Sequence, residues 1–378
     1  MQSYPVELLQ AMLETYSPSG SEQRLADLLH QHMLSHGFEV RKDRVGNVIG
    51  EFGNDGPRIL LCGHMDTVPG EIPVRIEGDF LYGRGSVDAK SSLAAMLVGS
   101  ILAKERSTLP FHVTLAGVVE EERSSDGAKA VIASGESHDL AVFGEPSGAS
   151  NIVIGYKGSL QLQVTCLTKG GHSASPWLSK NSYEEASEFW KTLQKSLLEN
   201  DSSSKFSAVT GCITSAIAGN GSNTIPSRTT LEIDIRIPPG LQAVHLANNI
   251  SEFARRYEEG HQGVRILIAV KDQTEAFLGS QDSGAVRAFR WAIRKTIGLQ
   301  AALVKKTGTS DMNLFAQSYS IPMVAYGPGD SSLDHTENEH VSISEYLRSI
   351  EVYANAIQQF ASLARDASVT SNYATVSS

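Results

Sequence analysis

Residues 60–69 read Leu-Leu-Cys-Gly-His-Met-Asp-Thr-Val-Pro, an apolar run that ends in two polar side chains. The run 59–62 predicts a buried strand of a parallel sheet, because such a strand is covered on both faces. His64 and Asp66 follow this strand, and alternate residues of an extended chain face the same side. His64 could therefore bind a metal ion through one ring nitrogen while Asp66 approaches the other nitrogen. For this pair taken alone, a polar loop without such a role is an equally good interpretation.

The length and composition indicate a globular protein with two domains. The chain has 378 residues, more than one hydrophobic core usually contains, and 41% of them are hydrophobic. No apolar run is long enough to cross a bilayer, and the first residues lack a signal-peptide pattern, so we expect a cytoplasmic protein without membrane contact. The net charge of −10 argues against a nucleic-acid partner. Cys62, Cys166 and Cys212 lie in apolar strand-like runs, which predicts reduced, buried thiols.

Two helices are predicted before the central strand. Residues 6–16 have an amphipathic pattern, and a second such pattern follows Ser19 and Glu22, which have the spacing of a capping box. Gly37 is typical of the end of this second helix. We expect both helices to be scaffold.

The segment 79–90, Asp-Phe-Leu-Tyr-Gly-Arg-Gly-Ser-Val-Asp-Ala-Lys, precedes a predicted helix at 91–106. Gly83 and Gly85 predict a turn with unusual backbone angles, and Asp88 stands just before the helix. Asp88 could cap the helix, or it could bridge two metal ions with its two carboxylate oxygens. A dinucleotide-binding loop is less favoured, because the third glycine of that motif is missing.

Carboxylates follow two further predicted strands. The strand 111–119 ends in the run Glu120-Glu121-Glu122, and the strand 140–143 ends just before Glu145. A run of acids is usually a solvated surface. The active sites of open parallel sheets, however, lie at the carboxyl ends of the strands. Carboxylates gathered there repel one another unless cations balance them.

The pattern changes at about residue 156 to that of an antiparallel unit, beginning with the half-exposed alternation of 160–164. Further strands are expected at 207–217, 228–237 and 264–270, and helices at 182–199 and 241–258. The predicted fold class is therefore α/β, a mixed and largely parallel sheet flanked by helices, with an inserted α+β domain. The sheet domain would comprise 1–155 and 271–365, and the insertion 156–270. Residues 366–378 lack periodicity, which predicts a flexible tail.

Four motifs, in their order along the chain, resemble the M20 family of dinuclear zinc amidohydrolases and peptidases. They are His64-x-Asp66, Gly85-x-x-Asp88-Ala-Lys, the glutamates after the strand 111–119, and Gly144-Glu145-Pro146. The resemblance covers almost the whole chain and implies that the insertion is a lid and dimerisation domain. It also implies a homodimeric hydrolase that cleaves amide bonds with two divalent metal ions. Zinc is the expected metal, and cobalt or manganese are possible substitutes.

The resemblance further assigns roles to the residues at the strand ends. Five residues match the family's metal ligands: His64, Asp88, Glu122, Glu145 and His335. Asp88 would bridge the two ions, with His64 and Glu145 on one ion and Glu122 and His335 on the other. Asp66 and Glu121 would be the catalytic residues, with Glu121 as the general base that passes a proton from water to the leaving amine. A register shifted by one residue, with Glu120 and Glu121 as base and ligand, stays open.

Four residues are expected to bind the substrate: His172, Asn223, Arg236 and Asp311. In the family, the Asn and Arg of the matching segments bind the substrate carboxylate, a task that suits the two-pronged guanidinium. The matching histidine reaches across the dimer interface. Asp311 could meet an amino group of the substrate. Without the family, a surface position on an edge strand would be the preferred interpretation of Arg236.

Three stretches, which begin at Glu120, Lys306 and Tyr326, resemble hydrolases that release lysine or ornithine from an amino-group carrier protein in lysine and arginine biosynthesis. An acidic carrier would need a basic patch, for which Lys157, Lys305 and Lys306 are candidates. One alternative is a small-molecule deacylase of the acetylornithine or succinyl-diaminopimelate type, or a di- or tripeptidase. The other is a non-catalytic, metal-stabilised binding protein.

Overall fold

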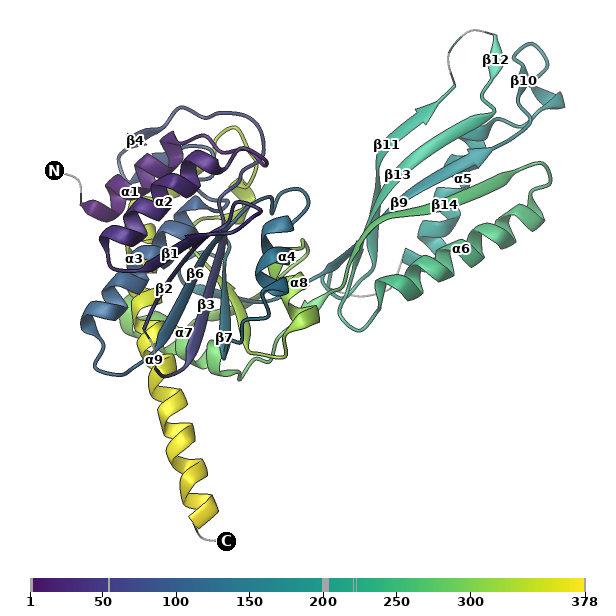
Figure 1. The fold of residues 1–378 in the computed structure, drawn as a ribbon. Coiled ribbons are helices and arrows are strands. Elements are labelled where there is room, and N and C mark those ends of the chain that lie inside the picture. The colour runs from purple at the N-terminus through teal and green to yellow at the C-terminus, as the bar shows by residue number, and fades with distance from the viewer. Residues whose placement is uncertain (1–2, 54, 199–203, 220, 222, 377–378) are drawn as a thin grey trace. The chain divides into compact units, whose positions relative to one another are not determined.

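The computed structural model describes residues 3–53, 55–198, 204–219, 221 and 223–376 (Figure 1). The chain forms two compact units. Unit 1 comprises Met1–Ile154, Gly279–Val304 and Leu314–Ser378, and unit 2 comprises Gly155–Leu278 and Lys305–Asn313.

Unit 1 is built on a mixed sheet whose strand order is β1-β2-β6-β3-β7-β17-β8-β15, with β16 beside β8. The four neighbours β6, β3, β7 and β17 run parallel to one another, and the outer pairs are antiparallel. The strands are β1 (Glu39–Lys42), β2 (Val48–Phe52), β3 (Arg58–His64), β6 (His112–Val118), β7 (Leu140–Gly144), β8 (Asn151–Tyr156), β15 (Phe277–Leu278), β16 (Ala302–Lys306) and β17 (Met323–Tyr326). The predicted mixed, largely parallel sheet is confirmed.

Helices cover both faces of this sheet (Figure 1). They are α1 (Tyr4–Glu14), α2 (Gln23–Ser35), α3 (Lys90–Arg106), α4 (Asp126–Ala133), α7 (Gly284–Ile297), α8 (Asp311–Ser318) and α9 (Ile343–Val376). A small three-stranded sheet of β4 (Arg75–Glu77), β5 (Phe80–Tyr82) and β18 (His340–Ser342), and the short helix η3 (Ser331–Leu333), complete the unit.

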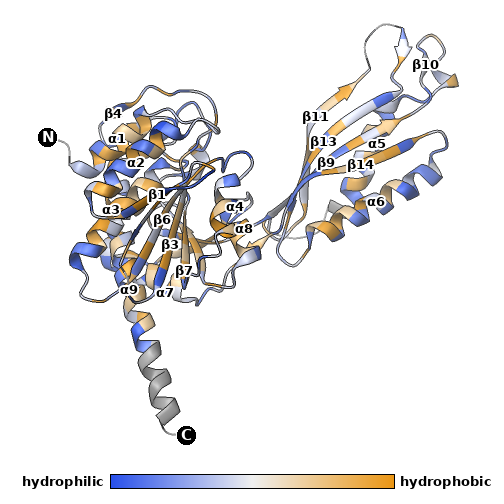
Figure 2. Cartoon of the chain, in the orientation of Figure 1, coloured by the Kyte–Doolittle hydropathy of each residue, from blue (hydrophilic) through white to orange (hydrophobic). Residues whose placement is uncertain are grey.

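The central strands β3, β6, β7 and β17 are largely apolar because both of their faces are buried, whereas the edge strand β1 is polar and exposed (Figure 2). Leu61 and Val142 belong to one large cluster with α1, α2, α3, α7 and α9. On the other face Phe143 packs edge-on against Phe315 of α8. Helix α3 is buried almost all round, and α9 lies so close to it that a Cβ added at Gly99 would come within 2.5 Å of the Tyr353 Cβ.

Unit 2 is an α+β unit with an antiparallel sheet of order β11-β13-β9-β14. Its elements are β9 (Gly158–Leu167), β10 (Gly171–His172), η1 (Pro176–Leu178), α5 (Ser182–Leu193), η2 (Gln194–Leu198), β11 (Thr210–Ala218), β12 (Thr224–Ile225), β13 (Arg228–Ile237), α6 (Ala243–Gly260) and β14 (Arg265–Thr274). Side chains of β13 alternate in burial, and Leu231, Ile233 and Ile235 pack against α5 and α6. Strands β10 and β12 form a separate two-stranded ribbon.

The unit boundaries differ from the expected insertion 156–270. Strand β14 continues its pairing with β9 as far as Thr274 and Ser159, which keeps the chain in unit 2 for longer. Residues Lys305–Asn313 also belong to unit 2, because the Lys157 amide donates to Lys306 O and the Asn313 side chain donates to Lys157 O.

Three local expectations need correction. Cys62 and Cys166 are buried as predicted, but Cys212 is exposed because β11 is an edge strand. The α-helix expected at 182–199 ends at Leu193 and continues as the short π-helix η2. Residues 366–378 were expected to be a flexible tail, whereas α9 continues through this segment to Val376. Among the described helices, each is too short or too polar to pass through a lipid bilayer.

Candidate metal centre

The carboxyl ends of β3, β6 and β7 lie side by side in unit 1. His64 is the last residue of β3 and pairs with Val118, so the acids that follow β6 start beside it. Strand β7 flanks β3 on its other side and leads to Glu145. The parallel topology therefore brings three distant segments to one edge of the sheet, as the sequence predicts.

Asp88 lies between the two histidines of this edge. Its Oδ1 is 3.1 Å from His64 Nε2, and its Oδ2 is 3.1 Å from His335 Nε2. His335 Nε2 is also 2.9 Å from Glu122 Oε1. The ligand atoms of His64, Asp88 and Glu145 lie within 4.8 Å of one another, and so do those of Asp88, Glu122 and His335. The structure thus brings together all five predicted ligands in two groups that share Asp88.

The donor set of both groups fits a divalent cation. Each group combines one imidazole with two carboxylates, a mixed nitrogen and oxygen set that suits zinc and related ions. His64 is buried, at 2% exposure, so its contacts with carboxylates are shielded from water. Three carboxylates gathered around two imidazoles are repulsive without positive charge, and two cations would balance them.

The carboxylates of the centre favour protonated imidazoles. Burial opposes a charge on the His64 ring, but hydrogen bonding to Asp66 and Asp88 outweighs burial and raises the pKa of His64 well above its usual value. Hydrogen bonds to Asp88 and Glu122 raise the pKa of His335 to about 10. Burial would raise the pKa of Asp88, but the two histidines outweigh it and lower that pKa. A cation that binds here replaces these protons, so acid weakens metal binding.

Asp66 organises the centre more broadly than predicted. The Nδ1 atom of His64 lies 2.9 Å from the backbone oxygen of Asp66 and 3.4 Å from its carboxylate. The Asp66 carboxylate also accepts hydrogen bonds from the Glu121 amide at 3.0 Å, the Glu122 amide at 3.1 Å and the Ser19 hydroxyl at 2.7 Å. Asp66 therefore positions both the His64 ring and the backbone of the acidic loop.

The predicted capping box of Ser19 and Glu22 is wrong. Glu22 is the N-cap residue of α2 without a side-chain capping bond, and Ser19 donates to Asp66 instead. The buried Glu22 carboxylate accepts the Glu120 amide at 3.1 Å. Glu120 has a φ of 57°, an uncommon angle for a residue with a side chain. Ser19 and Glu22 thus hold the loop after β6, and the S-x-x-E spacing alone predicted the simpler local role.

The positions of the three glutamates at 120–122 bear on which of them is the base and which the metal ligand. Glu122 faces His335, whereas the Glu120 carboxylate accepts a hydrogen bond from Ser124. Glu121 lies between them with its amide on Asp66. This arrangement supports the register in which Glu121 is the base and Glu122 the ligand.

A buried ion pair next to the centre was not predicted. Glu339 is 1% exposed, and its Oε1 accepts the amides of Val87 at 2.9 Å and Asp88 at 3.1 Å. Its Oε2 accepts Arg84 Nη1 at 2.8 Å. One carboxylate therefore holds the backbone of the bridging residue Asp88.

Arg84, the other member of this ion pair, also contacts the segment that follows His335. Its Nη1 also donates to the backbone oxygen of Thr336 at 3.0 Å, and Thr336 directly follows His335. Arg84 and Glu339 thus tie the Asp88 loop to the His335 loop. The His-Thr-x-x-Glu spacing was visible in the sequence, but Arg84 and Glu339 are 255 positions apart, so no local pattern indicated their contact.

The four expected substrate residues all lie in unit 2. His172 and Asn223 lie in or next to the β10–β12 ribbon, and both are exposed. Arg236 forms a two-pronged contact with Asp234, at 2.8 Å and 3.0 Å, and approaches the Thr309 hydroxyl at 3.4 Å. Asp311 is only 3% exposed, so its carboxylate is largely withdrawn from the surface of unit 2.

Lys157 is wrong as a member of the expected basic patch. Its side chain is fully buried, and its Nζ donates to the backbone oxygens of Lys205 and Ala208 and to the Thr210 hydroxyl. Burial lowers the pKa of Lys157 to about 8. The ammonium of Lys157 is satisfied inside unit 2 and faces no partner protein.

Comparison with known proteins places this geometry in a family context. Residues 60–359 match the model described as peptidase family M20/M25/M40. The LysW-lysine hydrolase of Deinococcus radiodurans is 33% identical over 358 residues, which cover 93% of this chain and 95% of that protein. The LysW-lysine/LysW-ornithine hydrolase of Sulfurisphaera tokodaii is 33% identical over 353 residues, which cover 93% and 94%.

Solved structures share the fold at lower sequence identity. A tripeptidase from Staphylococcus aureus has a TM-score of 0.81 at 19% identity, over 94% of this chain and 98% of that chain. A dinuclear metal-binding M20 peptidase from Bacillus subtilis has a TM-score of 0.73 at 15% identity, over 94% and 96%. At these identities the likeness extends to the fold alone.

Proposed function

Because this chain belongs to the M20 peptidase family, a family of metal-dependent hydrolases, we propose that it releases lysine or ornithine from an amino-group carrier protein by amide hydrolysis. Relatives that match 93% of the chain are named for this reaction on LysW. The observation that carries the proposal is the position of Asp88, 3.1 Å from both His64 and His335. A carboxylate shared by two ligand groups is suited to a pair of ions.

We propose zinc as the metal, with cobalt or manganese as substitutes. His64, Asp88 and Glu145 would hold one ion, and Asp88, Glu122 and His335 the other. When bound, the two ions supply Lewis-acid polarisation of the substrate carbonyl and acidify a water molecule.

Residues of this chain would carry out the proton transfer. Glu121 would accept a proton from the attacking water and deliver it to the amine as the amide C–N bond breaks. Asp66 would keep Glu121 in place through the backbone amide, at 3.0 Å, and would orient the His64 ring. The products are the free carboxyl group of the carrier and the released amino acid.

Unit 2 would bind the free end of the substrate. The released lysine or ornithine carries a carboxylate and an ammonium group, and Arg236 and Asp234 offer both opposite charges side by side. His172 and Asn223 would contact the substrate from the β10–β12 ribbon. Asp311 is a weaker candidate for the ammonium group, because it is buried.

We also infer that the protein works as a homodimer in the cytoplasm. Strand β11 is an edge of the unit 2 sheet and exposes Ile213 and Ile217, so its backbone is open to pairing with another chain. Light scattering after gel filtration would measure the mass directly, and a monomer at micromolar concentration would contradict this inference.

A substrate panel tests the activity. The purified protein would be assayed with carrier-linked lysine and ornithine, acetylornithine, succinyl-diaminopimelate and dipeptides, before and after chelation and with zinc restored. We expect the carrier-linked amino acids to give the highest kcat/KM, with activity lost to chelator and regained with zinc. A preference for a small acyl amino acid would favour the deacylase alternative, and a preference for dipeptides would favour the peptidase.

A further inference from the structure

No helix among the described residues of unit 2 covers one face of its sheet, which we call the open face. Helices α5 and α6 cover the opposite face, where Val164, Cys166 and Leu231 are buried. Side chains alternate between the faces along a strand, and cross-strand partners share a face. Arg228 pairs with Leu167, and Leu167 pairs with Arg265, so these three side chains form one row on the open face.

Three cations gather at one end of the open face. Arg228 and Arg265 stand on either side of Leu167, and Lys169 follows Leu167 by two residues. All three cations are exposed, and within the described ranges none of them forms a salt bridge. Their charge is therefore available to a partner.

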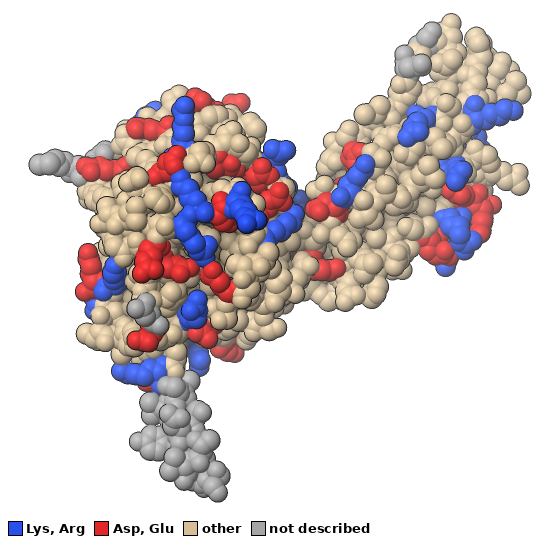
Figure 3. Space-filling view, viewed as in Figure 1, with Lys and Arg blue, Asp and Glu red and all other residues tan. Residues whose placement is uncertain are grey.

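Two arginines of α6, on the helix side of unit 2, differ from these three cations. Arg255 and Arg256 of α6 are paired with Glu252, at 2.8 Å and 3.0 Å. Figure 3 shows the same contrast, with basic and acidic atoms adjacent over α6 and basic atoms without acidic neighbours toward the β10–β12 end. Glu252 thus neutralises Arg255 and Arg256, whereas Lys169, Arg228 and Arg265 have no such partner among the residues that the structure describes.

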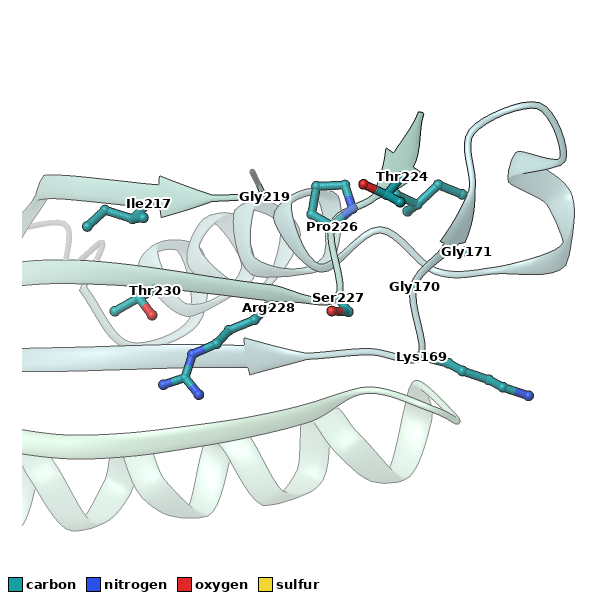
Figure 4. Close-up of a pocket in the computed structure, with 11 residues that line it drawn as sticks. Lys169, Gly170, Gly171, Ile217, Gly219, Thr224, Pro226, Ser227, Arg228 and Thr230 are labelled. Carbon is teal, nitrogen blue, oxygen red and sulfur yellow. The ribbon is translucent and has the colours of Figure 1, made fainter. Parts of the chain in front are cut away.

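Lys169 and Arg228 line a hollow of about 590 Å³ (Figure 4). Its wall includes the hydroxyl residues Thr224 and Ser227, which can donate hydrogen bonds to an anion. Gly170 has a φ of +61°, and a Cβ added there would come within 2.9 Å of the Ser227 Cβ. The lack of a side chain at Gly170 therefore lets this segment lie close to Ser227. The hollow therefore combines positive charge, neutral donors and close backbone approach.

The hollow shares the β10–β12 ribbon with two candidate substrate residues. Gly171 and Thr224 line it, and the adjacent residues in the chain are His172 and Asn223. A molecule bound at the hollow is therefore next to the segment that would contact the substrate.

We propose that Lys169, Arg228 and Arg265 form the docking surface for the carrier protein, which presents carboxylates to them. This rests on the proposed function. The chain carries a net charge of −10, so most of its surface repels an acidic partner. A local group of unpaired cations attracts such a partner and directs it to this face. Of the expected patch of Lys157, Lys305 and Lys306, only Lys157 is excluded by its burial. The proposal assigns recognition of the carrier to residues of unit 2, which are distinct from the metal ligands of unit 1.

Charge reversal tests the proposal. We would measure kcat/KM of Arg228→Glu, Arg265→Glu and the double variant on two substrates, the intact lysine-bearing carrier and a short peptide of its lysine-bearing end. On the intact carrier we expect about a tenfold loss for each reversed charge at low salt, a smaller loss at 0.3 M salt, and an unchanged kcat. Hydrolysis of the peptide should not change.

Lys191→Glu on α5 is the matched control, since it reverses an exposed charge on the helix side of the same unit. Equal losses in Lys191→Glu and Arg228→Glu would overturn the docking surface, as would equal losses on carrier and peptide. Competition by duplex DNA as strong as that by free carrier would show a general polyanion site instead. If the wild type cleaves neither carrier-linked substrate but does cleave acetylornithine, the proposed function fails first, and the docking surface fails with it.

Discussion

The metal centre of unit 1 and the open face of unit 2 hold their polar side chains in opposite ways. At the metal centre His64 and Asp66 are buried, and Asp66 alone receives hydrogen bonds from three other residues. On the open face Arg228 and Arg265 are exposed and have no carboxylate partner among the residues that the structure describes.

This difference separates chemistry from recognition. Buried groups with several partners have one orientation, which a reaction needs, and changing one of them leaves others unsatisfied. Exposed charges keep their hydration and act through attraction over a distance that salt screens. We therefore expect substitutions in unit 1 to lower kcat or metal affinity, and substitutions in unit 2 to raise KM.

The largest effect should come from Glu121→Gln. Glutamine keeps the shape and the backbone amide that donates to Asp66, but it is unable to accept the proton. We expect kcat to fall about a thousand-fold, with KM and metal content unchanged. Steady-state kinetics and elemental metal analysis would measure both quantities.

Glu120→Gln is the control for that variant, because the Glu120 side chain contacts Ser124 rather than the centre. It should retain most of the activity. The reverse result, with Glu120→Gln inactive and Glu121→Gln active, would show that the acidic run works in the shifted register.

The second effect concerns the ion pair behind the centre, and Glu339→Gln tests it. The amide can still accept the Val87 and Asp88 N–H groups, but it loses the charge that faces Arg84. Residues that support metal ligands typically contribute ten- to a hundred-fold to metal affinity or activity. We expect a loss of affinity in that range by zinc titration of the metal-free protein, and activity that excess zinc restores.

Glu351→Gln gives the matched comparison, since Glu351 pairs with Arg106 at 2.6 Å on the surface of the same unit. Exposed pairs contribute little, so its zinc affinity should equal that of the wild type. If Glu339→Gln bound two zinc ions as tightly as the wild type but stayed slow in excess zinc, the expected contribution of Glu339 to metal affinity would be ruled out.

The sequence predicted the candidate metal ligands better than the residues that hold them in place. Each of His64, Glu122 and Glu145 follows an apolar run, and the carboxyl ends of parallel strands meet at one edge, so local patterns were sufficient. The support comes from residues such as Glu22 and Glu339, whose partners are distant in the chain and whose local patterns indicate only a cap or a surface acid.

Local sequence patterns also failed to predict which charged side chains of unit 2 are buried and which are exposed. Lys157 follows a strand end and has the composition of a surface residue, but its Nζ finds three oxygens from the segment 205–210. Arg228 and Arg265 come from two separate strands, β13 and β14, and only the register of both strands with β9 puts them in one row. Register depends on the packed core and is not readable from one strand.

Arg236→Gln should have a smaller effect that is confined to binding. Removal of the guanidinium would leave Asp234 alone and take away the two-pronged partner for a substrate carboxylate. We expect KM to rise about tenfold and kcat to change little, with Arg256→Gln on α6 as the control. A fall in kcat at constant KM would instead place Arg236 with the reacting groups and would break the division between the units.

His138→Leu should leave turnover unchanged, because His138 precedes β7 at the end of the sheet opposite to the metal centre. His138 is 6% exposed, and neither ring nitrogen has a hydrogen-bond partner among the described residues. Burial lowers the pKa of His138 to about 4. Of the nearby charged groups, Glu136 and Asp139 raise this pKa, whereas Arg58 and His112 lower it.

The sign of the pH effect follows from proton binding. Between pH 6.5 and pH 4 the unfolded chain protonates His138 while the folded protein does not, so the free energy of unfolding falls as the pH falls. At pH 5 this amounts to about 2 kcal/mol, because one pKa unit corresponds to about 1.4 kcal/mol. Urea unfolding of His138→Leu should therefore lack this part of the decline, and the variant should gain on the wild type from pH 7 to pH 5. Parallel decline of His138→Leu and wild type would mean that the ring already takes up its proton in the folded state.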